Sequence, residues 1–157
     1  MIFFCPNCWA HVKEDEKVCH ECKTGIESFD HRSYFEKLVK ALSHPERTTR
    51  IRAAYILGAM RDHRAVKPLA KVLEKPVGME DVFLIETVAI SLGKVDGEEA
   101  IPVLIRMMDH PSFLVRRAAL TSLSIYRSEE VLQVIKKALR DPSPNVQELA
   151  QKILQSG

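Results

Sequence analysis

The stretch "VRRAALTSLSIYRSEEVLQVIKKALRDPS" at residues 115–143 contains two runs in which apolar residues recur at spacings of three and four. That spacing places the apolar side chains on one stripe of a helix, whereas a strand would alternate apolar and polar residues. A proline follows the second run, where it cannot continue a helix. The stretch therefore predicts a helical hairpin that ends in a proline-bearing turn.

The same hairpin recurs along the chain. Sliding its second helix toward the N-terminus aligns four segments, with steps of 31, 35 and 31 residues. The aligned apolar positions are Leu38, Leu69, Leu104 and Ile135, followed by Leu42, Leu73, Met108 and Leu139. The first-helix pattern occurs at 50–58, 85–93 and 116–124, and begins again at 147–155. Because one hairpin cannot bury both of its helices, the repeats are expected to stack around a continuous core.

These repeats predict an all-α fold over residues 29–157, a right-handed solenoid of helical hairpins. The hydrophobic content of 46% is sufficient for such a core. Residues 1–28 are predicted to form a separate small module. Within the solenoid we expect a half repeat at 31–45, full repeats at 47–76, 79–111 and 113–142, and a terminal helix at 144–156.

Two features of the repeats, a pair of equivalent glycines and an insertion, lead to further expectations. Gly58 and Gly93 stand at the predicted ends of first helices, where a left-handed backbone is expected. The longer step reflects four extra residues around 76–80, which should lengthen the next first helix and place Glu80 and Asp81 in its first turn. This insertion is either a tolerated change or a platform presented to a partner. The side chains that such a platform would display are Met79, Val82 and Phe83.

The repeats resemble a known family. The stretch quoted above and "RIRAAYILGAMRDHRAVKPLAKVLEKP" at 50–76 resemble the short HEAT-like repeats grouped with the phycobilisome-lyase-type proteins. The unit of that family has V-R, A-A and A-L-G in its first helix and L-x-D-P at the end of its second. The resemblance covers about residues 31–157 and implies a HEAT-like solenoid. Such repeats serve as scaffolds, inhibitors, DNA-repair folds and cofactor-attachment factors alike, so function stays open.

The N-terminal module contains all four cysteines, in two C-x2-C pairs separated by ten residues. Two such pairs complete a tetrahedral set of thiolates suited to Zn2+, and so short a module needs a metal in order to fold. We therefore expect one structural Zn2+ per chain. Four thiolates leave no position for a water ligand, which argues against catalytic zinc. A thiol redox switch that expels zinc on oxidation is the alternative. The expected ligands are Cys5, Cys8, Cys19 and Cys22.

The module also resembles the very short zinc ribbon found at the N-termini of bacterial and archaeal proteins. It departs from that pattern at Trp9 and Lys23, where glycine is usual. Trp9 is expected to pack the ribbon against the first helices, or alternatively to contact a partner. His11 and His20 lie near the ligands and could replace one of them, although surface positions are expected for both.

The register of the repeats also aligns four cations on successive second helices, each roughly 200° around the helix from a core position and therefore in solvent. The resemblance to HEAT-type solenoids implies that second helices line the concave surface, so the cations would form a basic stripe along a groove. An ordinary charged helix face is the alternative. The four cations are Lys40, Lys71, Arg106 and Lys137.

Charge differs between the two parts of the chain. Residues 1–30 have three Lys against six Asp and Glu, whereas residues 31–157 have twenty Lys and Arg against fifteen Asp and Glu. The basic groove is expected to bind a protein with an acidic surface, and nucleic acid is the second candidate partner. The row has no aromatic platforms for bases, which favours protein. The acidic module could instead fold back onto the basic face.

Nothing in the sequence indicates catalysis, since paired carboxylates, a nucleophile with a base, and a glycine-rich phosphate loop are not found. The expected function is a non-catalytic interaction scaffold. Nucleic-acid binding is one alternative, and tetrapyrrole attachment of a lyase-like kind, implied only by the family resemblance, is another. No run approaches the roughly 18 to 20 apolar residues that cross a bilayer, so no membrane partner is expected. The opening "MIFF" lacks the features of a signal peptide, and a cytoplasmic location is expected.

Overall fold

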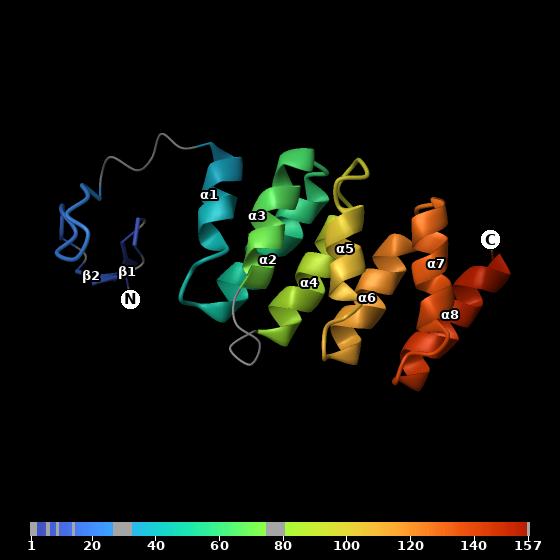
Figure 1. Ribbon diagram of the computed structural model, residues 1–157. Coiled ribbons are helices and arrows are strands. Elements are labelled where there is room, and N and C mark those ends of the chain that lie inside the picture. Colours follow the sequence, from blue (N-terminus) through green and yellow to red (C-terminus); the bar gives the residue numbers. More distant parts are fainter. Residues whose placement is uncertain are drawn as a thin grey trace.

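The computed structural model describes residues 3–5, 7–8, 10–13, 15–26, 33–74 and 81–156. Within these ranges it contains eight α-helices, preceded by a small antiparallel sheet near the N-terminus (Figure 1). The sheet pairs β1, Phe3–Phe4, with β2, His11–Val12. The helices are α1 Tyr34–Ala41, α2 Arg47–Ala59, α3 Val66–Lys71, α4 Val82–Leu92, α5 Ile101–Met107, α6 Phe113–Leu123, α7 Glu129–Ala138 and α8 Pro144–Ser156. The predicted all-α solenoid of helical hairpins is confirmed.

The helices form two rows (Figure 1). The helices that come first in each hairpin pack against one another in chain order, and these first helices are α2, α4, α6 and α8. The helices that come second in each hairpin make few contacts with each other, and these second helices are α1, which belongs to the initial half repeat, α3, α5 and α7. One cluster of buried side chains runs from Leu38 in α1 to Ala150 in α8, so the hairpins share a single core. The first-helix row is therefore the more closely packed of the two, and the expectation that second helices line a concave surface stays a prediction.

Gly58 and Gly93 do not serve as left-handed helix ends. Gly58 lies within α2, and Gly93 follows α4 with an ordinary helical φ of −70°. A Cβ on Gly58 would lie 2.6 Å from the Cα of Ser91, and one on Gly93 would lie 2.5 Å from the Cβ of Ser122. Both glycines therefore lie at contacts between successive first helices where a side chain would not fit. The left-handed residue after α2 is Arg61, with φ 55°.

The insertion does not lengthen α4. This helix begins at Val82 and has 11 residues, compared with 13 in α2. Asp81 is its N-cap rather than part of its first turn, and the Asp81 carboxylate accepts a hydrogen bond from the Leu84 amide. An N-cap carboxylate already satisfies a free helix amide, so the helix has a defined start at this position. Residues 75–80, which include Met79 and Glu80, lie outside the described ranges.

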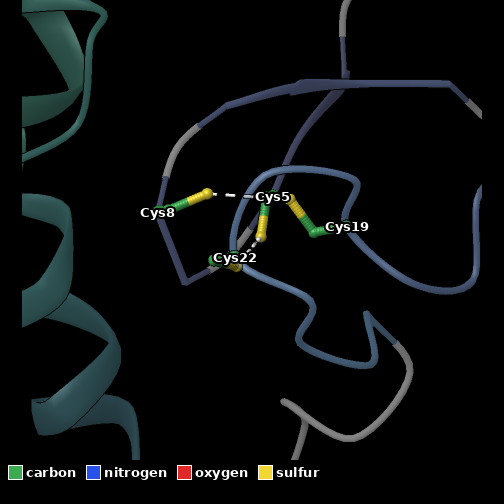
Figure 2. Close-up of side chains that lie close together, drawn as sticks. All are labelled: Cys5, Cys8, Cys19 and Cys22. Atoms are coloured by element: carbon green, nitrogen blue, oxygen red, sulfur yellow. Dashed lines mark hydrogen bonds between the residues drawn. The ribbon is translucent and has the colours of Figure 1, made fainter.

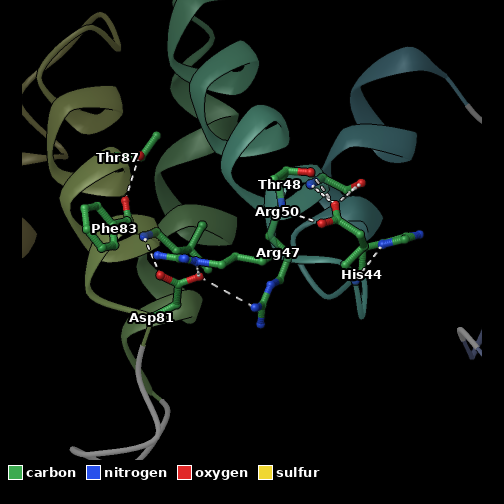
Figure 3. Close-up of polar contacts among 10 residues, drawn as sticks. His44, Arg47, Thr48, Arg50, Asp81, Phe83 and Thr87 are labelled. Carbon is green, nitrogen blue, oxygen red and sulfur yellow. Dashed lines mark hydrogen bonds and ion pairs between the residues drawn. The ribbon is translucent and has the colours of Figure 1, made fainter.

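The N-terminus of α4 is joined to α2 by charged contacts (Figure 3). The Arg47 Nε donates to Asp81 Oδ2 at 2.8 Å, and Arg50 Nη2 lies 3.7 Å from the same oxygen. The Arg47 guanidinium also stacks over the Phe83 ring, 4.8 Å from its centroid. The exposed Phe83 is thus one side of an interhelix contact, while Val82 packs against the core.

The turns that lead into α2, α6 and α8 each contain the same type of hydrogen bond. The residue before the proline accepts a hydrogen bond from the backbone N–H two positions later. The Nδ1 of His44 accepts from Glu46 N at 3.0 Å, and the Nδ1 of His110 accepts from Ser112 N at 3.0 Å. At the equivalent position Asp141 Oδ1 accepts from Ser143 N at 2.8 Å. The two histidines therefore act as turn formers, as Asp does in many turns.

Candidate metal centre and basic face

The two C-x2-C segments fold into a pair of matching turns. In the first turn Cys5 N donates to Ala10 O at 2.8 Å, and in the second Cys19 N donates to Thr24 O at 2.9 Å. Both bonds join a cysteine to the residue five positions later. Lys23 adopts φ 57°, so the second turn takes the left-handed conformation that glycine usually supplies, and it does so with a lysine. Trp9, the equivalent residue of the first turn, lies outside the described residues.

The four cysteine sulfurs converge on one point (Figure 2). Cys5 Sγ lies 3.7 Å from Cys22 Sγ, Cys8 Sγ lies 3.7 Å from Cys19 Sγ, and all four sulfurs lie within 4.8 Å of one another. A disulfide would need about 2.05 Å. Tetrahedral coordination with metal–sulfur bonds of about 2.3 Å places sulfurs ~3.8 Å apart. The donor set therefore fits a four-coordinate metal ion.

Polar groups next to the sulfurs favour the thiolate form. Asn7 N donates to Cys5 Sγ at 3.4 Å, and Asn7 Nδ2 donates to Cys22 Sγ at 3.6 Å. Contact with the Thr24 hydroxyl, followed by the Thr24 amide and Asn7, lowers the pKa of Cys22 to about 5. For Cys8 the amide of Ala10 acts in the same direction, but desolvation and the other three thiols outweigh it and raise the pKa to about 12. Four neighbouring thiols cannot all ionise without a cation, and a divalent metal supplies that charge.

The sulfur cluster also forms the interior of the module. Cys5 and Cys19 are fully buried together with Val12, and Ala10 and Ile26 pack around them. This cluster is separate from the core of the helices. So few apolar side chains cannot offset the entropy of ordering the module, which makes a bound metal the natural source of stability.

The two histidines near the ligands are surface residues. His20 is exposed, and its Nδ1 lies 2.9 Å from Glu16 Oε1, so the ring is engaged in a surface hydrogen bond. His11 is exposed on β2. Among the described residues only the four cysteines bring ligand atoms together at this point.

The structure places the four aligned cations on the second-helix row. Lys40 is half-buried near the end of α1, while Lys71, Arg106 and Lys137 are exposed on α3, α5 and α7. Lys137 Nζ lies 3.6 Å from Asp109 Oδ1, and no other member of the row has an ion pair with a described residue. Hollows open beside the row at both ends, one of about 510 Å³ that includes Lys40 and Lys71 and one of about 1010 Å³ that includes Lys137.

Comparison with known proteins agrees with the two-row architecture. A family model described as HEAT repeats matches residues 9–82 and 84–155. The chain belongs to the HEAT-repeat family. No curated protein matches it. Among solved structures, the HEAT repeats are similar to the complex of CpcE and CpcF of phycocyanin lyase from Nostoc sp. PCC7120, at 20% identity and a TM-score of 0.57, over 88% of this chain and 68% of that one. An engineered protein is similar at 22% identity and a TM-score of 0.57, over 78% and 62%. Such likenesses establish the fold.

One buried polar pair in these HEAT hairpins is not predicted by the sequence pattern. The Arg116 guanidinium at the start of α6 meets the Asp141 carboxylate after α7, with Nε–Oδ2 and Nη2–Oδ1 distances of 2.8 Å. Both side chains are almost fully buried. The available signal was Arg in the V-R pair of the repeat and Asp in its final D-P pair, but their spacing alone does not show that they meet.

Among the described residues, no helix is both long enough and apolar enough to span a bilayer.

Proposed function

We propose that this HEAT-repeat protein is a non-catalytic scaffold that binds a protein partner with an acidic surface through its second-helix row. The observation that carries the proposal is the repetition of one cation on four successive second helices. The row consists of Lys40, Lys71, Arg106 and Lys137. Three of these side chains have no counter-charge among the described residues, so their charge is available to a partner.

Partner capture tests this proposal. The combined variant Lys71→Glu, Arg106→Glu and Lys137→Glu should lose partners that the wild type retains in affinity capture with mass spectrometry. A matched control reverses three exposed cations on the first-helix row, Arg52→Glu, Arg117→Glu and Lys152→Glu, and should retain them. Equal capture by the wild type and the second-helix variant would refute the role of the row. Capture with residues 1–28 deleted shows whether the N-terminal module contributes, including through Trp9.

We further propose that residues 1–28 and 29–157 are separate domains, and that the first contains one structural Zn2+ bound by Cys5, Cys8, Cys19 and Cys22. The sulfur distances and the separate apolar cluster support this assignment. Zinc favours four thiolates in a tetrahedron, and a closed thiolate shell leaves it no catalytic water. Thiolate ligands persist in a reducing compartment, which supports a cytoplasmic location.

The likeness to the CpcE–CpcF complex supports a second candidate function, tetrapyrrole attachment of the lyase kind. A titration of the protein with a linear tetrapyrrole distinguishes the two candidates. A saturable change in tetrapyrrole absorbance would favour the lyase-like function, and an unchanged spectrum would favour the scaffold. Nucleic-acid binding, in contrast, would give a salt-sensitive gel shift.

A further inference from the structure

The larger hollow of the second-helix row lies between α5 and α7 and the turns that follow them. Its volume is about 1010 Å³, which is at the upper end of the range for ligand pockets, about 300–1,000 Å³. Its apolar lining consists of Ile105, Met108, Val134, Ala138 and Leu139. Leu139 is 39% exposed, so a large apolar side chain at this edge remains in contact with solvent. The hollow offers apolar contact area to a side chain from another molecule.

The rim of this hollow is positively charged. Lys136 and Arg140 are exposed there and have no ion pair with any described residue. Lys137 is the third exposed cation, and Asp109, at 3.6 Å from it, is the exposed acid that opposes these charges. The carboxylate of Asp141 is buried and engaged by Arg116, so it does not offset the rim. A ligand therefore meets excess positive charge around an apolar floor.

A hollow on the other row provides the contrast. It lies along α4, α6 and α8 and has a volume of about 470 Å³. Its charged lining is balanced, since Glu86 and Glu148 stand against Arg117 and Lys152. Excess positive charge beside an apolar hollow is thus a property of the α5–α7 site and not of every hollow on the molecule.

Hydrogen bonds hold together the turns that border the hollow. Arg116 Nη1 donates to His110 O at 2.8 Å and to Pro111 O at 2.9 Å, while its other nitrogens bind Asp141. One buried guanidinium therefore joins the turn after α5 to the turn after α7. Because the walls are already positioned, little ordering is required when a ligand binds.

We propose that the hollow between α5 and α7 binds a linear peptide segment in which one large apolar side chain is flanked by Asp or Glu. The apolar side chain enters the hollow, and the flanking carboxylates meet Lys136 and Arg140. This inference rests on the proposed scaffold function and narrows it to one site and one peptide chemistry. Apolar burial provides affinity there, and the cations select the acidic flanks.

A displayed library of random short peptides, selected on the full zinc-loaded chain, tests the site. Enriched peptides should combine Leu, Ile, Met or Phe with neighbouring Asp or Glu. Fluorescence anisotropy then compares one enriched peptide on the wild type and on three double variants, of which Lys40→Glu with Lys71→Glu probes the hollow at α1 and α3. The double variant Lys136→Glu and Arg140→Glu should weaken binding about tenfold or more, because attraction becomes repulsion. The matched control, Arg117→Glu and Lys152→Glu, has the same change in net charge and should bind as the wild type does. Replacing the apolar residue of the peptide by Ser should also weaken binding about tenfold.

Any one of four results would overturn the proposal. Selection could yield no binding peptide or no acidic bias, the two double variants could lose affinity equally, or the Ser peptide could bind as well as its parent. Loss of affinity in Lys40→Glu with Lys71→Glu, but not in Lys136→Glu with Arg140→Glu, would move the site to the hollow at α1 and α3. That result would be compatible with the scaffold function but would refute the peptide site between α5 and α7. The capture experiment with an intact partner tests the scaffold function independently.

Discussion

Arg116 and Asp141 form a bidentate ion pair in which two guanidinium nitrogens each lie 2.8 Å from a different carboxylate oxygen. The third guanidinium nitrogen donates to the carbonyls of His110 and Pro111. The pair therefore connects the N-terminus of α6 to the ends of two neighbouring second helices. Each charge is compensated and each buried polar atom has a partner, which is the condition for a stable buried pair.

Arg116→Ala should destabilise the protein by about 3 kcal/mol, because it leaves the Asp141 carboxylate buried without its partner. Urea unfolding measured by circular dichroism gives this value. Arg117→Ala, one residue away and exposed, is the control and should change the free energy of unfolding by less than about 0.5 kcal/mol. Equal effects of the two variants would show that the buried pair contributes nothing specific.

Acid should destabilise the helical stack through carboxylates that are hydrogen-bonded in the folded state. Contacts from the Thr48 hydroxyl, then from the Thr48 and Thr49 amides, lower the pKa of Glu46 from 4.5 to about 2. The hydrogen bonds from Arg116 lower the pKa of Asp141 in the same direction. Stability from a group with a lowered pKa is fully present above its unfolded pKa and is lost as pH falls through the folded value.

The melting temperature should therefore fall from about pH 4.5 toward about pH 2. Glu46→Gln should make this part of the profile shallower, because glutamine does not titrate. Carbon-detected NMR titration of the Glu46 carboxyl measures its pKa directly. A midpoint near 4.5 in the folded protein would contradict the hydrogen bonds to Thr48 and Thr49.

Gly58→Ala should destabilise the protein by about 2 kcal/mol, although alanine is the better helix former. The new Cβ would lie 2.6 Å from the Cα of Ser91, and a backbone atom cannot move aside without separating α2 from α4. At Gly93 the closest atom is the Ser122 side-chain oxygen at 2.4 Å. Adding Ser122→Gly should thus rescue Gly93→Ala more fully than Ser91→Gly rescues Gly58→Ala. Thermal unfolding compares the four variants, and equal rescue would show that the backbone contact at Gly58 is unimportant.

Metal removal should unfold the N-terminal module and leave the helices intact. Metal analysis of protein prepared under reducing conditions should find one zinc per chain, and a strong chelator should abolish the NMR signals of residues near the cysteines. The far-ultraviolet helical signal should persist, because the core of the helices contains no cysteine.

Single substitutions identify the ligands. Cys8→Ser and Cys19→Ser should each lose zinc, whereas His20→Ala, whose ring pairs with Glu16, should retain it. Zinc loss in His20→Ala, or full zinc content in Cys19→Ser, would contradict the four-cysteine site.

Several outcomes show where sequence reasoning worked. The positions aligned at Leu38, Leu69, Leu104 and Ile135 are all buried in one core. Helical periodicity is a local property, so a single hairpin shows it and the repeat confirms it. The grouping of the cysteines into two C-x2-C pairs could also be predicted from the sequence, because this spacing is a local property. Only the convergence of the two pairs on one point depends on the tertiary structure.

The glycines and the insertion were misjudged for one reason. In the sequence Gly58 stands at the predicted end of a helix, but its role depends on its contact with Ser91 in the next hairpin. Asp81 likewise begins α4 through a capping hydrogen bond and contacts Arg47 of α2. Contacts across hairpins depend on the rotation between repeats, and no local pattern encodes that rotation.

The sequence by itself determined that this protein is a stack of helical hairpins behind a module with four cysteines, because helix periodicity, proline turns and ligand spacing are properties of short segments. Only the tertiary structure decided which row of helices packs closely, that Arg116 reaches Asp141, and that Lys136 and Arg140 flank an apolar hollow. These features arise from the way successive hairpins pack, which brings together side chains from different repeats.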